Sequence, residues 1–517
     1  MLANERFIVK MSLEQKVKFV TSVTPYESST VDKYEFPIFK LKGQPYEDCP
    51  SVRATCFPSD RALAATWNSR LIRDVYRAVG EETRRVHSFG YFNNTADYTL
   101  EEVSSDNFVT AKFILARMAG LSAGNQAVNF EKTYGADSAE VYDEMFVTNT
   151  VLKDVQPTSV FIKTPEDIEK IRKEFKYAGA FFGAAADVEG AAKLLLAGCS
   201  LVFIEEEFLP ALVNFLTERT EAYRKAYKSY RGGTLSLGEF DRRVRSLEIF
   251  DEAMIDEACD RLLTILFAMK DGGENIPPMT GIDKKRPAKF DEIAHDALAL
   301  KAARQSAVLL KNDGILPLTH HTRVAVAGEY ANDFSYQKEL FGIYPTVKSL
   351  PFDAIYGYEE ITATGFVTGY ARGEHGRADL IDSALELAGR SDCVLLYLSA
   401  GRGQTMLPSE QTELIDALHE KGVGIIAVVA CQQPIDLAFI DKCRAVLLTY
   451  SGGQQGTTAV LDILTGIVSP SGRLAEEAIG GNGDVKFPLG FGLSYTTFDY
   501  RALKVSEKGV SFTIANT

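Results

Sequence analysis

Residues 445–474 read AVLLTYSGGQQGTTAVLDILTGIVSPSGRL and decide the fold of the second half of the chain. The apolar run AVLLTY is followed by a glycine-rich turn and then by an apolar segment with helical spacing. Gly452, Gly453 and Gly456 stand where a tight turn after a strand needs backbone freedom. The stretch therefore predicts a buried strand, a tight turn and a helix, which is the repeating unit of an α/β sheet.

The same pattern recurs on the N-terminal side of this stretch. The other apolar runs are SAVLLK (306–311), RVAVAG (323–328), CVLLYLSA (393–400) and GIIAVVA (424–430). Helix-like segments lie between them, among them DLIDSALELAG and SEQTELIDALHEKG. Because the runs are continuously apolar rather than alternating, we expect a sheet that is covered on both faces.

The sequence pattern divides the rest of the chain into three further regions. Residues 1–271 alternate helix-like segments with apolar runs, which predicts a parallel sheet or a barrel. Residues 272–288 collect Pro, Gly and Lys without periodicity and are the predicted linker to a domain at 289–494. Residues 495–517 alternate like β-strands, and two strands alone are marginally stable. We therefore interpret them as the start of an all-β module that is cut short, or completed by something else.

Composition restricts the function. The chain has 517 residues, 46% of them hydrophobic, and a formal net charge of −14, which disfavours nucleic acid and anionic membranes as partners. Its seven Cys include no C-x-x-C pair, which argues against a disulfide framework and a structural zinc site. The charged first twenty residues do not resemble a signal peptide, and no window reaches 18 apolar residues. We expect a cytoplasmic protein without cofactor or bound metal.

Three segments of the second half resemble the α/β sandwich domain of glycoside hydrolase family 3. They are Ala303–Leu318 (ARQSAVLLKNDGILPL), Tyr450–Leu474 and Phe487–Tyr500 (FPLGFGLSYTTFDY), which stand in the order and spacing of the family. Ala54–Glu82 and residues 179–198 (GAFFGAAADVEGAAKLLLAG) resemble its barrel domain more faintly.

The resemblance implies a fold class. We expect a reduced TIM-barrel-like (β/α) N-terminal domain, an α/β sandwich domain and a short C-terminal β segment of a fibronectin type III-like module. Residues 50–270 supply about 220 residues, close to the minimum for a (β/α)₈ barrel, so few remain for long catalytic loops.

Family 3 enzymes are retaining glycosidases, most often acting on β-glucosides, xylosides or N-acetylglucosaminides. They use an Asp nucleophile at a strand end and usually a Glu acid/base from the second domain. Counting back from the end of residues 179–198, the nucleophile position is Ala184 and the adjacent Trp position is Ala185. The loop that would carry the Glu reads Gly401-Arg402-Gly403-Gln404-Thr405. An alanine can neither attack an anomeric carbon nor transfer a proton, whereas a retaining mechanism needs two carboxyl groups about 5–5.5 Å apart.

Other polar elements of the family are also altered. Its D-G-P element appears as Lys42-Gly43-Gln44-Pro45, its R-N-F-E stretch as residues 94–98 and its K-H-F strand as residues 129–132. Asp187 and Glu189 lie just past the strand end and, with Glu131, are the candidate substitute carboxylates. The preferred interpretation of Asp187 and Glu189 is that they stabilise the N-terminus of the next helix. The same applies to Glu205-Glu206-Glu207 after the run CSLVFI.

Three functional hypotheses remain open. The first is a degenerate family member that has lost catalysis and either binds a glycoside or oligosaccharide or pairs with an active subunit. Arg402, Gln404 and Asp187 would then contact sugar. The second is an active β-glycosidase with relocated carboxylates. The third is a structural or assembly subunit that forms a homo- or hetero-oligomer through the C-terminal β segment, whose exposed strand edge can pair with another chain.

Overall fold

The computed structural model describes most of the chain. The described residues are 2–24, 41–42, 54–86, 91–95, 103–104, 106–124, 127–131, 149–154, 157–271, 291–328, 331, 351–356, 362–367, 377–400, 404–431, 434–481, 483–506 and 509–517. The predicted linker at 272–288 lies outside these residues. Within the described ranges, no helix combines the length and apolar character needed to cross a membrane.

The chain divides into two compact units. The first unit comprises Met1–Val52, Tyr76–Thr99 and Ala111–Phe290. The second comprises Arg53–Val75, Leu100–Thr110 and Asp291–Thr517. Two segments from the first half of the sequence thus belong to the second unit, and the boundaries drawn from the sequence at 271 and 289 stay a prediction.

The second unit is built on a mostly parallel sheet. Its strands are β8 (Val308–Asn312), β9 (Arg323–Ala327), β10 (Thr362–Val367), β11 (Cys393–Leu398), β12 (Ile425–Val429) and β13 (Ala445–Leu448). They lie in the order β10-β9-β11-β12-β13-β8, and only the pairing of β13 with β8 is antiparallel. The apolar runs of the sequence therefore form the strands of one sheet.

Both faces of this sheet are buried, as the continuous apolar runs predicted. Alternate strand residues enter two separate cores, so that Leu396 lies in one core and Leu395 in the other. The first core includes side chains of α3, α16 and α17, and the second includes side chains of α15 and α18. The second unit is thus a layered α/β sandwich.

Helices and short strands complete the second unit. They are α3 (Asp60–Ala65), α13 (Glu292–Ser306), α15 (Pro351–Tyr356), α16 (Arg377–Ala388), α17 (Ser409–Glu420), α18 (Gly456–Leu464), the 3₁₀ turns η3 (Ile440–Lys442) and η4 (Gly453–Gln455), and the paired strands β14 (Ala478–Ile479) and β15 (Val485–Phe487). Two more helices, α4 (Ser69–Val86) and α6 (Asn107–Ala123), have residues in both units.

The first unit contains a parallel sheet. Its strands are β1 (Thr21–Ser22), β2 (Leu41–Lys42), β3 (Tyr91–Thr95), β4 (Ala127–Glu131), β5 (Ser159–Ile162), β6 (Ala180–Ala184) and β7 (Leu201–Phe203). They lie in the order β1-β7-β6-β5-β4-β3-β2, and each pair of neighbouring strands is parallel. From β2 to β7, strands that follow one another in the chain are also neighbours in the sheet, and β1 lies beside β7. Closure into a TIM-like barrel stays a prediction.

Helices complete the first unit. They are α1 (Glu5–Ile8), α2 (Leu13–Val20), α8 (Pro165–Phe175), α9 (Val188–Ala197), the 3₁₀ turn η1 (Glu206–Phe208), α10 (Leu209–Arg231), α11 (Leu237–Arg245) and α12 (Glu252–Asp271). One apolar core joins β5, β6 and β7 to α2, α8, α9, α10 and α12. The alternation of helices and strands predicted for residues 1–271 is therefore confirmed in the part of this region that the structure describes.

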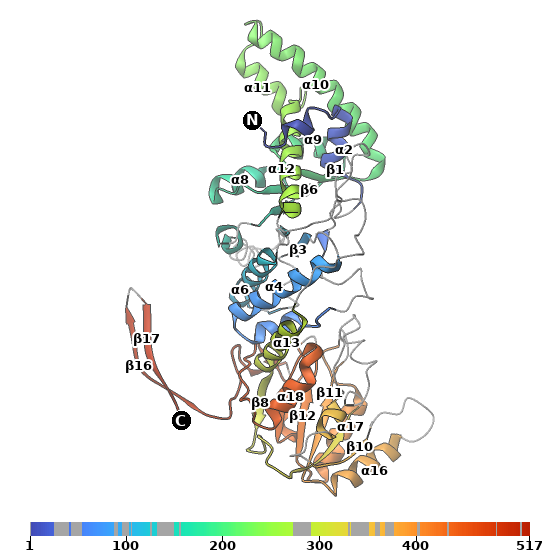
Figure 1. The fold of residues 1–517 in the computed structure, drawn as a ribbon, viewed down its shortest axis with the longest axis vertical. Helices are drawn as coiled ribbons and strands as arrows, with labels where there is room; N and C mark the ends of the chain where they lie inside the picture. Colours follow the sequence, from blue (N-terminus) through green and yellow to red (C-terminus); the bar gives the residue numbers. More distant parts are fainter. Residues whose placement is uncertain are drawn as a thin grey trace. The chain divides into compact units, whose positions relative to one another are not determined.

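The C-terminal residues form an antiparallel ribbon of β16 (Phe498–Ser506) and β17 (Gly509–Asn516) (Figure 1). The register pairs Tyr500 with Ile514 and Val505 with Val510, and an irregularity lies between Arg501 and Lys504. Ala502 in this bulge has a positive φ of 55°. The bulge places the apolar side chains on one face, and they are 42% to 74% exposed: Phe498, Tyr500, Leu503, Val505, Val510, Phe512 and Ile514. The predicted β character is confirmed, whereas membership of a fibronectin-like module stays a prediction.

Candidate functional site

The carboxyl end of β6 carries no polar side chain. β6 is buried from Ala180 to Gly183 and exposes only its last residue, Ala184. Ala185 and Ala186 follow, so that three consecutive methyl groups stand where the strand ends. The end of β6 itself therefore supplies no group that can attack a carbon or move a proton.

The nearest candidate carboxylates stabilise the N-terminal turn of the next helix. Asp187 is the N-cap of α9, and its carboxylate accepts a hydrogen bond of 2.6 Å from the backbone N–H of Gly190. Glu189 lies in the first turn and forms a 2.8 Å ion pair with Lys193, one turn along the helix. Both side chains are exposed. Their arrangement matches the capping role preferred from the sequence.

The other sequence candidates of the first unit are spread over different strands. Glu131 is the last residue of β4 and pairs in register with Phe161, but its side chain lies outside the described part. Glu205, Glu206 and Glu207 are exposed and precede α10, as expected of acidic residues at a helix N-terminus. Residues 43–45, 96–98 and 132 lie outside the described ranges.

The second unit places its candidate loop at a favourable position of the sheet. The chain leaves β9 toward β10 and returns to β11 on the other side of β9, so the strand order reverses between β9 and β11. Ligands of open α/β sheets bind at the carboxyl ends of the strands at such a point. Gln404 follows β11 and is exposed, while Arg402 lies outside the described residues.

The start of this loop is fixed by side-chain hydrogen bonds. The amide of Gln411 accepts from the Ser399 N–H at 3.0 Å and donates to its carbonyl at 2.8 Å. Further along, the carbonyl of Thr405 accepts 2.7 Å from the N–H of Asp436, which follows β12. The loop after β11 is thus tied to the loop after β12.

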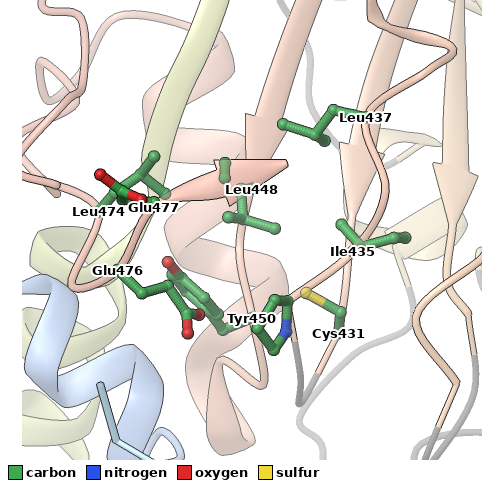
Figure 2. Close-up of a pocket in the computed structure, with 10 residues that line it drawn as sticks. Cys431, Ile435, Leu437, Leu448, Tyr450, Leu474, Glu476 and Glu477 are labelled. Atoms are coloured by element: carbon green, nitrogen blue, oxygen red, sulfur yellow. The ribbon is translucent and has the colours of Figure 1, made fainter. Parts of the chain in front are cut away.

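A second group of polar side chains lies near the carboxyl ends of β12 and β13, and the sequence analysis did not find it. The pocket in Figure 2 is lined by Cys431, Pro434, Ile435, Leu437, Leu448, Tyr450, Leu474, Glu476, Glu477 and Ala478. Arg61, on α3, forms a buried ion pair with Glu476. The signals in the sequence were an arginine inside the apolar helix DRALAA and two consecutive glutamates after the buried Leu474.

The protonation states in this pocket follow from burial. Burial raises the pKa of Glu476 above its ordinary value, and the Arg61 guanidinium opposes this shift. Burial also raises the pKa of the Cys431 thiol to about 12 and the pKa of Tyr450 well above its usual range. The thiol and the phenol are therefore neutral at pH 7. Among the described side chains, no group of three or more His, Cys, Asp or Glu is arranged to hold a metal ion.

Comparison with known proteins relates this architecture to one family. The family model "Glycosyl hydrolase family 3 C-terminal domain" matches residues 307–495, which include the whole mostly parallel sheet of the second unit. Thermostable beta-glucosidase B of Acetivibrio thermocellus is 26% identical, over 98% of this chain and 74% of its own length. A beta-xylosidase of Formosa agariphila is 26% identical over 50% of this chain and 41% of its own length.

Solved structures share the fold. The GH3 beta-glucosidase of Bifidobacterium adolescentis aligns with a TM-score of 0.75 at 22% identity, covering 99% of this chain and 82% of its own. A beta-glucosidase of Kluyveromyces marxianus aligns with a TM-score of 0.76 at 14% identity, covering 99% and 87%. Residues 307–495 thus match the C-terminal domain of glycosyl hydrolase family 3, and nearly the whole chain is similar in sequence to a beta-glucosidase and shares the fold of solved beta-glucosidases.

Proposed function

We propose that this chain is a family 3 protein of carbohydrate metabolism that binds a glycoside or oligosaccharide and is catalytically impaired. The observation that carries the proposal is the end of β6, where Ala184 occupies the position that resembles the nucleophile of the family. Loss of a covalent nucleophile lowers the rate by about 10⁴–10⁶ in enzymes where it has been removed. The capping bond of Asp187 and the ion pair of Glu189 give these carboxylates another role.

Sugar contacts are assigned to the loop after β11. Gln404 is exposed at the strand-order reversal, where ligands of α/β sheets bind. We extend the assignment to Arg402 in the same loop and to Asp187 at the end of β6. Similarity to beta-glucosidases and beta-xylosidases supports a β-glycoside as the ligand class.

The proposal is tested by hydrolysis of aryl β-glucosides and aryl β-xylosides. We expect no turnover by the wild-type protein and measurable turnover by the double variant Ala184→Asp, Gln404→Glu, which restores a carboxylate at both positions. Asp187→Asn is the matched control because asparagine caps a helix as well as aspartate does. Wild-type turnover that Asp187→Asn abolishes would refute the proposal and establish the alternative of relocated carboxylates.

The apolar face of the β16–β17 ribbon favours a second role in assembly. A two-stranded ribbon is marginally stable alone, and a large exposed apolar patch marks an interaction site. Its side chains would be covered by a homo- or hetero-oligomeric partner. Replacing Leu503 and Val505 by lysine is expected to convert an oligomer into a monomer in sedimentation equilibrium, whereas a monomeric wild-type protein would rule out self-assembly.

We also assign the protein to the cytoplasm. In the part of the chain that the structure describes, Cys56, Cys199, Cys259, Cys393, Cys431 and Cys443 are free thiols, which fits a reducing compartment. Fractionation of the source cells tests this assignment, and recovery of the chain outside the cytoplasm would overturn it.

A further inference from the structure

The phenol of Tyr450 is the most unusual polar group of the second unit. Its side chain is 2% exposed, and its oxygen has no hydrogen-bond partner among the residues that the structure describes. A buried hydroxyl without a partner is unfavourable by about 1–3 kcal/mol relative to a bonded one. The fold keeps this group unsatisfied although a phenylalanine would fill the same space.

The backbone of Tyr450 is also held in an unfavourable conformation. Its φ is +48°, the left-handed region that bulky residues rarely adopt. Tyr450 lies two residues after the end of β13 and precedes the glycine turn, so the strained backbone holds the ring near the carboxyl end of the sheet. Strain at such positions persists where the surrounding structure enforces it, and it concentrates at ligand sites.

The space beside Tyr450 is small. The pocket leaves about 20 Å³ for the centre of a water-sized group, enough for one or two non-hydrogen atoms. Figure 2 shows the ring of Tyr450 beside Glu476, with Leu448 and Ile435 on other parts of the wall. The exposed Glu477 lies at the rim, where the pocket meets solvent.

The pocket is electrically balanced. The carboxylate of Glu476 is paired with Arg61, and the phenol and thiol carry no charge. An ion in this space would lose its hydration without gaining an opposite charge, which is strongly unfavourable. Apart from Glu477 at the rim, the remaining wall is aliphatic. A neutral group with one hydroxyl and one short apolar segment therefore suits the pocket.

We infer that this pocket binds the hydroxymethyl group of a neutral sugar, with the Tyr450 phenol as its hydrogen-bonding anchor and Leu448, Leu474 and Ile435 against its methylene. The inference rests on the proposed carbohydrate function for the class of ligand. It deepens that function, because a hydroxymethyl group distinguishes hexoses from pentoses such as xylose. The loop after β12, which supplies Pro434 and Ile435, is bonded to the loop that carries Gln404.

The test compares D-glucose with D-xylose, which lacks the hydroxymethyl group, by isothermal titration of the full chain. We expect the wild-type protein to bind glucose about three- to tenfold more tightly, the range of one added hydrogen bond. Tyr450→Phe removes only the oxygen and should abolish the preference. Equal binding of the two sugars, binding of neither, or a preference that survives Tyr450→Phe would each overturn the inference.

Tyr495→Phe is the matched control. The Tyr495 hydroxyl donates a 2.6 Å hydrogen bond to the carbonyl of Ile463, so its removal should lower the melting temperature and leave sugar preference unchanged. Tyr450→Phe should instead leave the melting temperature of the sugar-free protein unchanged or raise it. A fall as large as that of Tyr495→Phe would show that the phenol is already bonded, for example to a resident water, and would contradict a ligand site. Glycoside turnover is a separate readout that tests only the proposed function.

Discussion

At the residue scale, substitutions of Asp187 distinguish a structural role of its carboxylate from a catalytic one. Its carboxylate caps α9 through the N–H of Gly190. We expect Asp187→Ala to lower the free energy of unfolding by about 1 kcal/mol and Asp187→Asn to change it by only a few tenths. Urea unfolding of the three proteins measures this difference. Equal losses in both variants would mean that the carboxylate acts by its charge and not as a cap.

Glu476 gives a prediction about pH. Burial raises its pKa in the folded state above the ordinary value of 4.5, with Arg61 opposing, so the folded protein holds the proton more tightly than the unfolded chain. The resulting stabilisation is complete below pH 4.5 and is lost as the pH rises through the folded-state pKa.

Unfolding of wild type and Glu476→Gln across this range isolates the effect. The stability of the wild type relative to the variant should fall as the pH rises, because glutamine does not titrate. A relative stability that rises with pH would show that Arg61 outweighs burial and lowers the pKa.

At the element scale, Gly453 constrains the turn between β13 and α18. Gly453 has a φ of +67°, and a Cβ there would lie 2.4 Å from the carbonyl oxygen of Cys56. Gly456, three residues on, begins α18 and has open space around it. Gly453→Ala should therefore lower the free energy of unfolding by about 1–3 kcal/mol or more, whereas Gly456→Ala should be neutral or stabilising.

Thermal or chemical denaturation of the two alanine variants compares identical chemical changes in one turn. Similar effects of both substitutions would show that the close approach to Cys56 does not constrain the turn. Sequence alone marked both glycines as turn residues, but it could not tell which of them another segment approaches.

The strands and helices were largely predictable because each run carries its own pattern. Alternate residues of 393–398 enter opposite cores, as a continuously apolar strand requires. The capping of α9 by Asp187 was likewise visible as an acidic residue before an apolar helix. The bulge at Ala502 was not, because only the cross-strand register shows that it keeps the apolar side chains on one face.

At the scale of the whole molecule, long-range pairings limited what the sequence could predict. Arg61 and Glu476 are 415 positions apart, and only folding brings them together. The same holds for the placement of residues 53–75 in the second unit, where Ala62 and Ala65 pack against the sheet. The family resemblance predicted the sandwich domain but gave no indication of the Tyr450 pocket, which depends on these contacts.

The central claim is that the end of β6 no longer supplies a nucleophile. The most direct measurement is the intact mass of the protein after incubation with an activated 2-deoxy-2-fluoro-β-glucoside, which traps the covalent intermediate of retaining glycosidases. We predict no mass increase for the wild type and addition of one fluoroglucosyl group to the Ala184→Asp, Gln404→Glu variant. A wild-type adduct that peptide mapping places on Asp187 or Glu189 would contradict the claim.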